Sequence, residues 1–117
     1  MLTTKHAATH FIVTSILVLS AGATNANKAH SIIANQSESE RRAFLTSFIK
    51  NSGESCDSAT KSFFQGFSKQ REAFWNVRCR NGRAYLIKIN DDATGSTKIL
   101  DCGVLKAVGG GECFKKF

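Results

Sequence analysis

The hydrophobic pattern is clearest over residues 38–50, where it predicts a helix. Ser37 and Glu40 stand at the spacing of a capping box in front of this segment. Gly53 follows its end, as is common after a helix. The apolar residues within the segment recur at helical intervals: Ala43, Phe44, Leu45, Phe48 and Ile49.

Residues 74–90 show the alternating pattern of a β-hairpin, with a turn near Gly82. A two-residue loop would place Trp75 opposite Lys88. A three-residue loop, residues 80–82, instead keeps the large apolar side chains together. It also puts Gly82 where such a loop needs a positive φ. We therefore predict the longer loop, in which the cross-strand pairs are Val77 with Tyr85 and Trp75 with Ile87.

The segment "CDSATKSFFQGF" has two interpretations. Asp57 or Ser58 could cap a short helix that continues to Gln65, with Gly66 after it. The same residues are prone to form a strand, because threonine and phenylalanine are enriched in sheets. We favour the short helix and keep the strand as the alternative.

The remaining pattern completes a small sheet. "DDATGS" reads as a turn, "TKILDCGVL" as a third strand, and "AVGGGECFKKF" as a glycine-rich loop with a basic tail. The predicted fold class is α+β, with one or two N-terminal helices packed on a three-stranded antiparallel meander.

Residues 1–26 have the layout of a secretory signal peptide. Lys5 lies in the short leading region, and an apolar run follows from Phe11 to Ala23. This run is shorter than the roughly 20 residues that a transmembrane helix needs. Small residues allow cleavage after Ala23 or after Ala26. We expect a secreted or periplasmic protein without a transmembrane span in its mature chain.

After the signal peptide, we expect a flexible lead-in over 27–36 and one small domain over 37–117. A small exported domain commonly needs disulfides, because its core is modest. The chain has four cysteines, Cys56, Cys79, Cys102 and Cys113. A zinc site is the alternative, but the chain lacks the C-x-x-C pairs that usually accompany one.

The predicted layout also indicates which cysteines pair. Cys79 and Cys102 end the two outer strands of the meander at the same edge. Two strand spacings separate them by about 9.6 Å, whereas a disulfide spans Cα separations of up to roughly 7 Å. We therefore predict the pairs Cys56–Cys79 and Cys102–Cys113.

The sequence indicates no catalytic chemistry. The histidines are His6, His10 and His30. The first two lie in the signal peptide and His30 in the lead-in, so we expect no histidine in the folded part and no Cys–His or Ser–His arrangement. "NDDATGSTKILD" partly matches a calcium loop, but strands and not helices should flank it. We expect no enzyme, no cofactor and no metal site.

The basic balance suggests where a partner could bind. The formal net charge is +7, and candidate partner-binding residues are Arg78, Arg80 and Arg83 at the hairpin turn, with Lys115 and Lys116 near the end. Export makes nucleic acid an unexpected partner. An extracytoplasmic protein or an anionic envelope component fits better.

Residues 56–102 resemble a pattern found in small exported proteobacterial proteins of unassigned function. The shared positions are Trp75, Val77, Cys79, Gly82, Tyr85, Gly95, Ser96, Thr97, Leu100 and Cys102. The order of a helix and then a meander is also similar to half of a PepSY-type domain, a module associated with inhibition of secreted peptidases. These resemblances imply an exported small binding protein, such as an inhibitor or accessory subunit. The alternative is a basic structural protein that binds an anionic envelope component or a membrane surface.

Overall fold

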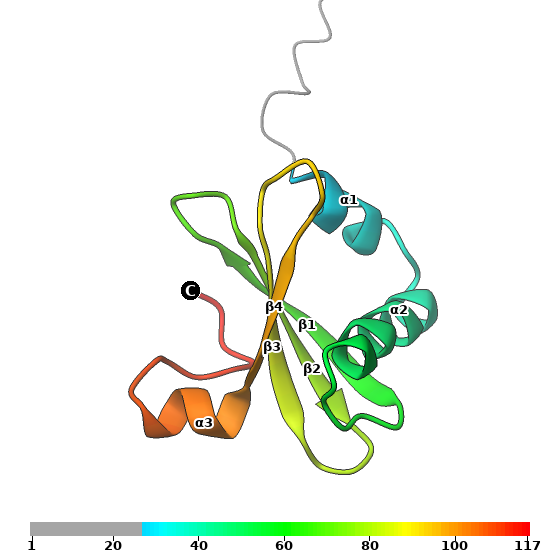
Figure 1. Ribbon diagram of the computed structural model, residues 1–117, viewed down its shortest axis with the longest axis vertical. Coiled ribbons are helices and arrows are strands. Elements are labelled where there is room, and N and C mark those ends of the chain that lie inside the picture. Colours follow the sequence, from blue (N-terminus) through cyan, green and yellow to red (C-terminus); the bar gives the residue numbers. More distant parts are fainter. Residues whose placement is uncertain (1–26) are drawn as a thin grey trace, which may run out of the picture.

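The computed structural model describes residues 27–117, so the predicted signal peptide, residues 1–26, lies outside the described residues. The fold is α+β, with helices on a four-stranded antiparallel sheet (Figure 1). In chain order the elements are α1 (Lys28–Ala34), α2 (Glu38–Asn51), β1 (Ala59–Phe67), β2 (Ala73–Cys79), β3 (Ala84–Ile89), β4 (Thr97–Asp101) and α3 (Cys102–Ala107).

The sheet is a meander in the order β1-β2-β3-β4. The β2–β3 hairpin has the predicted three-residue loop, with Val77 opposite Tyr85 and Trp75 opposite Ile87. Gly82 has a φ of +88°, and its N–H donates to the Cys79 carbonyl at 3.0 Å. The register prediction is confirmed.

The favoured short helix at 57–65 is wrong, because this segment forms β1. Its backbone pairs with β2 from Ala59 to Phe67. A β-bulge between Phe64 and Gly66 interrupts the pairing, and Gly66 has a φ of +145° there. Pairing along a neighbouring strand thus outweighs the local capping signal of Asp57 and Ser58. The sheet consequently has four strands where three were predicted.

The lead-in also differs from the expectation of a flexible segment, because it contains helix α1. Asn27 caps this helix by accepting from the His30 N–H at 3.1 Å. The Asn27 amide donates to the carbonyls of Ile89 at 2.9 Å and Arg71 at 3.1 Å. Ile33 is fully buried. A buried cap and one buried aliphatic side chain therefore fix α1 on the sheet.

The predicted helix over 38–50 is confirmed as α2, with the capping box of Ser37 and Glu40. Its first turn also covers the free edge of β1. The Glu38 carboxylate accepts from the Ser62 N–H at 3.2 Å, and the Arg42 guanidinium donates to the Thr60 carbonyl at 3.2 Å. These bonds occupy edge groups that could otherwise pair with another chain.

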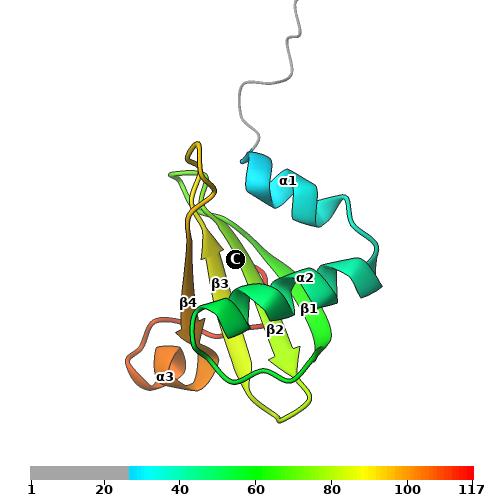
Figure 2. The ribbon, with the colours of Figure 1, turned by 45° about the vertical axis from the view of Figure 1, so that its right-hand side comes forward.

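One face of the sheet, which we call the helix face, carries the main core. It contributes Trp75, Val77, Tyr85, Ile87 and Ile89. Helices α1 and α2 pack on this face with Ile33, Leu45 and Ile49, and Figure 2 shows α2 lying across the sheet. The buried Cys56–Cys79 disulfide belongs to the same core.

The predicted third strand is shorter than expected. It ends at Asp101, whose carboxylate accepts from the Val104 N–H at 3.0 Å and caps α3. Cys102, at the start of α3, forms a disulfide with Cys113. Both disulfides therefore have the pairing that the sequence predicts.

The opposite side of the sheet, which we call the strap face, carries Phe74, Asn76, Arg78, Leu86 and Lys88, which alternate with the helix-face residues. The C-terminal strap, residues 112–117, crosses this face from α3 toward β1 (Figures 1 and 2). Neither α1 nor α2 covers this face, so the two faces of the sheet have different neighbours.

Candidate functional site

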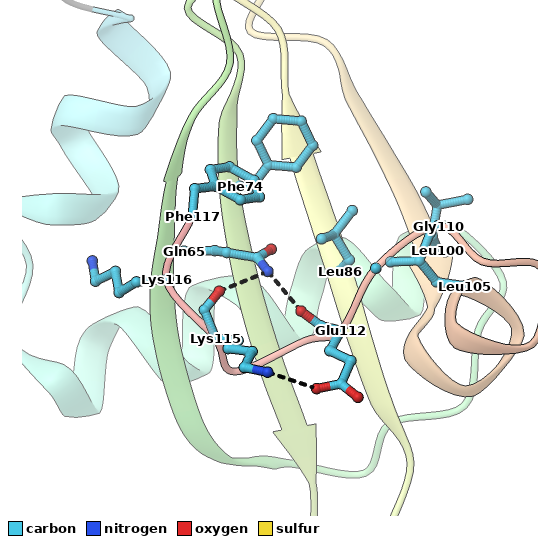
Figure 3. A pocket seen from close by; sticks show the side chains of 11 residues that line it. Gln65, Phe74, Leu86, Leu100, Leu105, Gly110, Glu112, Lys115, Lys116 and Phe117 are labelled. Atoms are coloured by element: carbon cyan, nitrogen blue, oxygen red, sulfur yellow. Dashed lines mark hydrogen bonds and ion pairs between the residues drawn. The ribbon is translucent and has the colours of Figure 1, made fainter.

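The strap face holds an open apolar pocket of about 280 Å³ between the sheet, α3 and the strap (Figure 3). Phe74, Leu86 and Leu100 form its floor, because they are strand residues on this side of the sheet. Leu105 from α3 and Phe117 from the strap form its walls. The cavity can therefore accept an apolar group without movement of the helix-face core.

Two buried amides position the strap. Gln65 donates to the carbonyls of Glu112 at 2.8 Å and Lys115 at 3.0 Å (Figure 3). Gln65 also accepts from the Asn76 amide at 3.2 Å. The Asn76 oxygen in turn accepts from the Phe114 N–H at 2.6 Å. Asn76 is fully buried, so loss of the strap would leave these polar groups without their partners.

The rim of the pocket is partly apolar and partly charged. Phe117 is 73% exposed, and its ring packs edge-on against Phe74 at 5.4 Å between centroids. Glu112 pairs with Lys115 at 3.5 Å and with Lys106 at 3.6 Å. Two more exposed apolar residues, Val104 and Val108, lie on the adjoining α3 and its end. Exposed apolar groups around a concave site are typical of a docking surface.

A second group on the strap face combines cations with aromatic rings. We call it the basic–aromatic cluster, and its members are Lys61, Phe63, Arg78, Phe114 and Lys116. The Lys61 ammonium and the Arg78 guanidinium each lie 4.9 Å from the centroid of Phe114. The Lys116 ammonium lies 5.4 Å from the centroid of Phe63. These contacts fall in the range of cation–π interactions.

Phe114 holds a strained backbone conformation within this cluster. Its φ of +61° is unusual for a bulky side chain and costs about 1–3 kcal/mol. The Asn76 hydrogen bond and the neighbouring Cys102–Cys113 disulfide fix the residue in place. Such strain persists only where the surroundings determine it, and it concentrates at functional sites.

The structure separates the basic residues that the sequence groups together. Arg78 and Lys116 join the basic–aromatic cluster. Arg80 lines a shallow hollow beside α2. Arg83 lies beside the Tyr85 hydroxyl, whose hydrogen bond raises the pKa of the guanidinium. Lys115 lines the pocket and pairs with Glu112. The three arginines of the turn therefore do not form one surface.

Sequence reasoning missed Lys61, Phe63 and Phe114 as members of a site. Lys61 and Phe63 are strand residues in a segment that was predicted to be a helix. Phe114 lies within the segment that we treated only as a basic tail. The cross-strand pairing of Lys61 with Arg78 could have been found only if β1 had been recognised as a strand.

The expectation of no histidine in the folded part is wrong, because His30 packs into the helix face. Its Nδ1 accepts from the Trp75 indole N–H at 3.0 Å. The rings of Phe64 and Phe67 lie 4.5 and 4.7 Å from the imidazole centroid. Burial, followed by the nearby Arg41 guanidinium, lowers the pKa of His30 below its ordinary 6.5. The neutral imidazole therefore serves as an acceptor within an aromatic cluster.

The loop that partly matched a calcium pattern is organised by hydrogen bonds of its own. The Asp92 carboxylate accepts from the N–H groups of Thr94 at 3.1 Å and Ser96 at 3.0 Å, and from the Ser96 hydroxyl. These bonds lower the pKa of Asp92 to about 2. Strands β3 and β4 flank the loop. The Asp92 carboxylate therefore stabilises the turn between these strands.

Within residues 27–117, no three His, Cys, Asp or Glu side chains lie close enough to hold a metal ion. None of the helices that the structure describes is long and apolar enough to cross a membrane. Comparison with known protein families, curated proteins and solved structures finds no match to this chain.

Proposed function

We propose that the protein is a small exported binding protein, acting as an inhibitor or accessory subunit of an extracytoplasmic protein. The open apolar pocket on the strap face carries this proposal. A sheet face that serves only as scaffold would be filled or covered, as the helix face is. The strap face instead keeps a cavity with Phe117 exposed at its rim.

The size of the pocket supports a protein partner. Its volume of about 280 Å³ lies just below the 300–1,000 Å³ or so that is usual for small-molecule sites. One large apolar side chain of a partner can fill it as an anchor. The surrounding rim residues can then exclude water from that contact.

Export rests on the signal-peptide pattern and on the two disulfides, which persist in oxidising compartments. We therefore place the binding event outside the cytoplasm. Of the two predicted cleavage positions, after Ala23 and after Ala26, the second would begin the mature chain at Asn27, whose side chain fixes α1 to the sheet.

A second candidate function is binding of an anionic envelope component. The observation that favours it is the basic–aromatic cluster, where Lys61, Arg78 and Lys116 are all exposed. A polyanion could bind these cations without use of the apolar pocket.

Differential capture tests the main proposal. The bait is the secreted protein, and the sample is an extracytoplasmic extract. Leu105→Trp should fill the pocket, and we expect it to reduce recovery of the bound protein about tenfold. Ile32→Trp is the matched control, because Ile32 is 60% exposed on α1 and should leave recovery unchanged.

Thermal melts of both variants establish that each is folded before capture is compared. Equal recovery by the two tryptophan variants would remove the pocket from the docking surface. Recovery of a polysaccharide or lipid, in place of a protein, would favour the second candidate function.

A further inference from the structure

We propose that the partner presents acidic side chains beside its apolar anchor, and that the basic–aromatic cluster binds those carboxylates. This inference rests on the proposed function, because it assigns the partner's chemistry at the same face. It concerns Lys61, Arg78 and Lys116. Lys116 also borders the pocket, and its side chain points away from the cavity in Figure 3.

The first argument is that these three cations lack a counter-charge within residues 27–117. Three other basic residues on or beside the strap face have acidic partners: Lys88 pairs with Glu72, and both Lys106 and Lys115 pair with Glu112. Lys98, opposite Lys88 on β4, forms no ion pair with a described residue, but it lies away from the cluster at the other edge of the sheet. Lys61, Arg78 and Lys116 form no ion pair with any of the described residues. Their charge is therefore available to a ligand.

The second argument is that two of the cations oppose each other. Lys61 and Arg78 are direct cross-strand partners on β1 and β2, an arrangement that is unfavourable for like charges. Both also contact the ring of Phe114 from 4.9 Å. A carboxylate placed between the two would relieve their repulsion, and Arg78 could bind it through two parallel hydrogen bonds.

The third argument is that the cations are held in position before binding. The ring of Phe114 contacts two of them, and the residue itself is fixed by Asn76 and Cys102–Cys113 despite its strained φ. Lys116 rests on Phe63 and Phe64. Side chains that are already ordered lose less entropy when a ligand binds.

The apolar pocket beside the cluster favours an acidic protein over a simple polyanion as the ligand. Both the cluster and the pocket border the strap, and Lys116 directly precedes the pocket residue Phe117. A typical protein partner covers about 800 Å² on each side, which is enough to span the strap. A phosphate polymer or sulfated polysaccharide would leave the apolar pocket empty. The two features together match an acidic polypeptide surface with one apolar anchor.

Selection from a random peptide library displayed on phage tests this inference with the full secreted protein as target. We expect enriched peptides in which Asp or Glu residues flank a Phe, Leu, Ile, Met or Trp. The triple variant Lys61→Gln, Arg78→Gln and Lys116→Gln should bind the best such peptide about tenfold more weakly. It should also lose most of the salt dependence of that binding.

The matched control is Lys28→Gln, Lys50→Gln and Lys69→Gln, which removes the same charge from exposed residues outside the cluster. It should keep the affinity and the salt dependence. Enriched peptides without acidic residues, or equal effects of the two triple variants, would overturn the inference and leave the pocket proposal standing. Peptides that bind Leu105→Trp as well as the parent protein would instead overturn the pocket proposal.

A separate arm measures cosedimentation with phosphatidylglycerol vesicles and with phosphatidylcholine vesicles. We expect no cluster-dependent binding to either. Binding to the anionic vesicles that the cluster variant abolishes, without any peptide enrichment, would assign the cluster to a lipid surface and overturn the inference.

Discussion

The helix face and the strap face of the sheet use alternate residues of the same strands, yet one face is closed by packing and the other keeps an open cavity. On β2, Trp75 is 4% exposed beneath the helices, whereas its neighbour Phe74 lies half-buried in the floor of an open pocket. The helix face is closed by packing of α1 and α2. The strap face is crossed by a short segment that leaves a cavity beside it.

The disulfides follow the same division. Cys56 and Cys79 are 3% and 2% exposed within the helix-face core. Cys102 and Cys113 are half-exposed and tether the strap. The comparison shows that in this small domain one side of the sheet carries the closed core, whereas the other side keeps an open cavity, which is the side that the proposed function assigns to a partner.

The largest expected difference between the two faces is in stability, and substitutions on the helix face should cost the most. Trp75→Ala should lower the free energy of unfolding by about 3–5 kcal/mol, because a large buried aromatic leaves a cavity. Phe74→Ala should cost about 1–2 kcal/mol, because its ring already borders open space. Urea denaturation of both variants measures the difference.

Peptide binding at the strap face supplies the second half of this test. Phe74→Ala should weaken binding although the protein stays folded, whereas folded Trp75→Ala should retain it. Equal losses of stability would show that the two faces carry the fold alike. A fully stable Trp75→Ala would show that burial of the tryptophan does not stabilise the helix face.

A smaller effect on stability should come from the titration of His30, which tests the packing of the helix face. The pKa of His30 is lowered in the folded state, so the unfolded chain takes up its proton first as the pH falls. Its contribution to stability is complete above about pH 6.5 and declines below that value as the pH approaches the folded pKa. Thermal melts from pH 7 to pH 5 should follow this decline.

His30→Gln is the control, and its melting temperature should change less over that range. His6 and His10 are common to both chains, so they cancel in the difference. The carboxylates whose pKa is lowered, Glu72 and Asp92, have ordinary values of 4.5 and 3.8 and titrate mainly below this window. An identical pH slope in both proteins would contradict the assignment.

The sequence predicts the parts of the fold that depend on nearby residues. The capping box of Ser37 and Glu40 defines α2, and the position of Gly82 defines the hairpin loop. The predicted strand order places Cys79 and Cys102 too far apart for a disulfide and so favours the pairs Cys56–Cys79 and Cys102–Cys113, which the structure has. Each of these inferences used one local rule and a short separation along the chain.

The elements that the sequence does not predict depend on contacts between residues that are distant along the chain. Helix α1 needs the bond from Asn27 to the Ile89 carbonyl, which joins positions 62 residues apart. Strand β1 needs the edge of β2, so its local helix signal misled the prediction. The strap needs the buried amides Gln65 and Asn76. In sequence, Gln65 looks like the end of a short helix and Asn76 like a solvent-facing strand residue. The candidate site is built mainly from these distant contacts, and only Arg78 and Lys116 of its basic–aromatic cluster were foreseen.

Site-specific photo-crosslinking tests the central claim most directly. A benzophenone-bearing phenylalanine replaces either Phe117, which is 73% exposed on the strap face, or Phe44, which is 38% exposed on α2. Irradiation in an extracytoplasmic extract should give a protein adduct from position 117 and none from position 44. An adduct from position 44 alone would place the partner on the helix side and contradict the account.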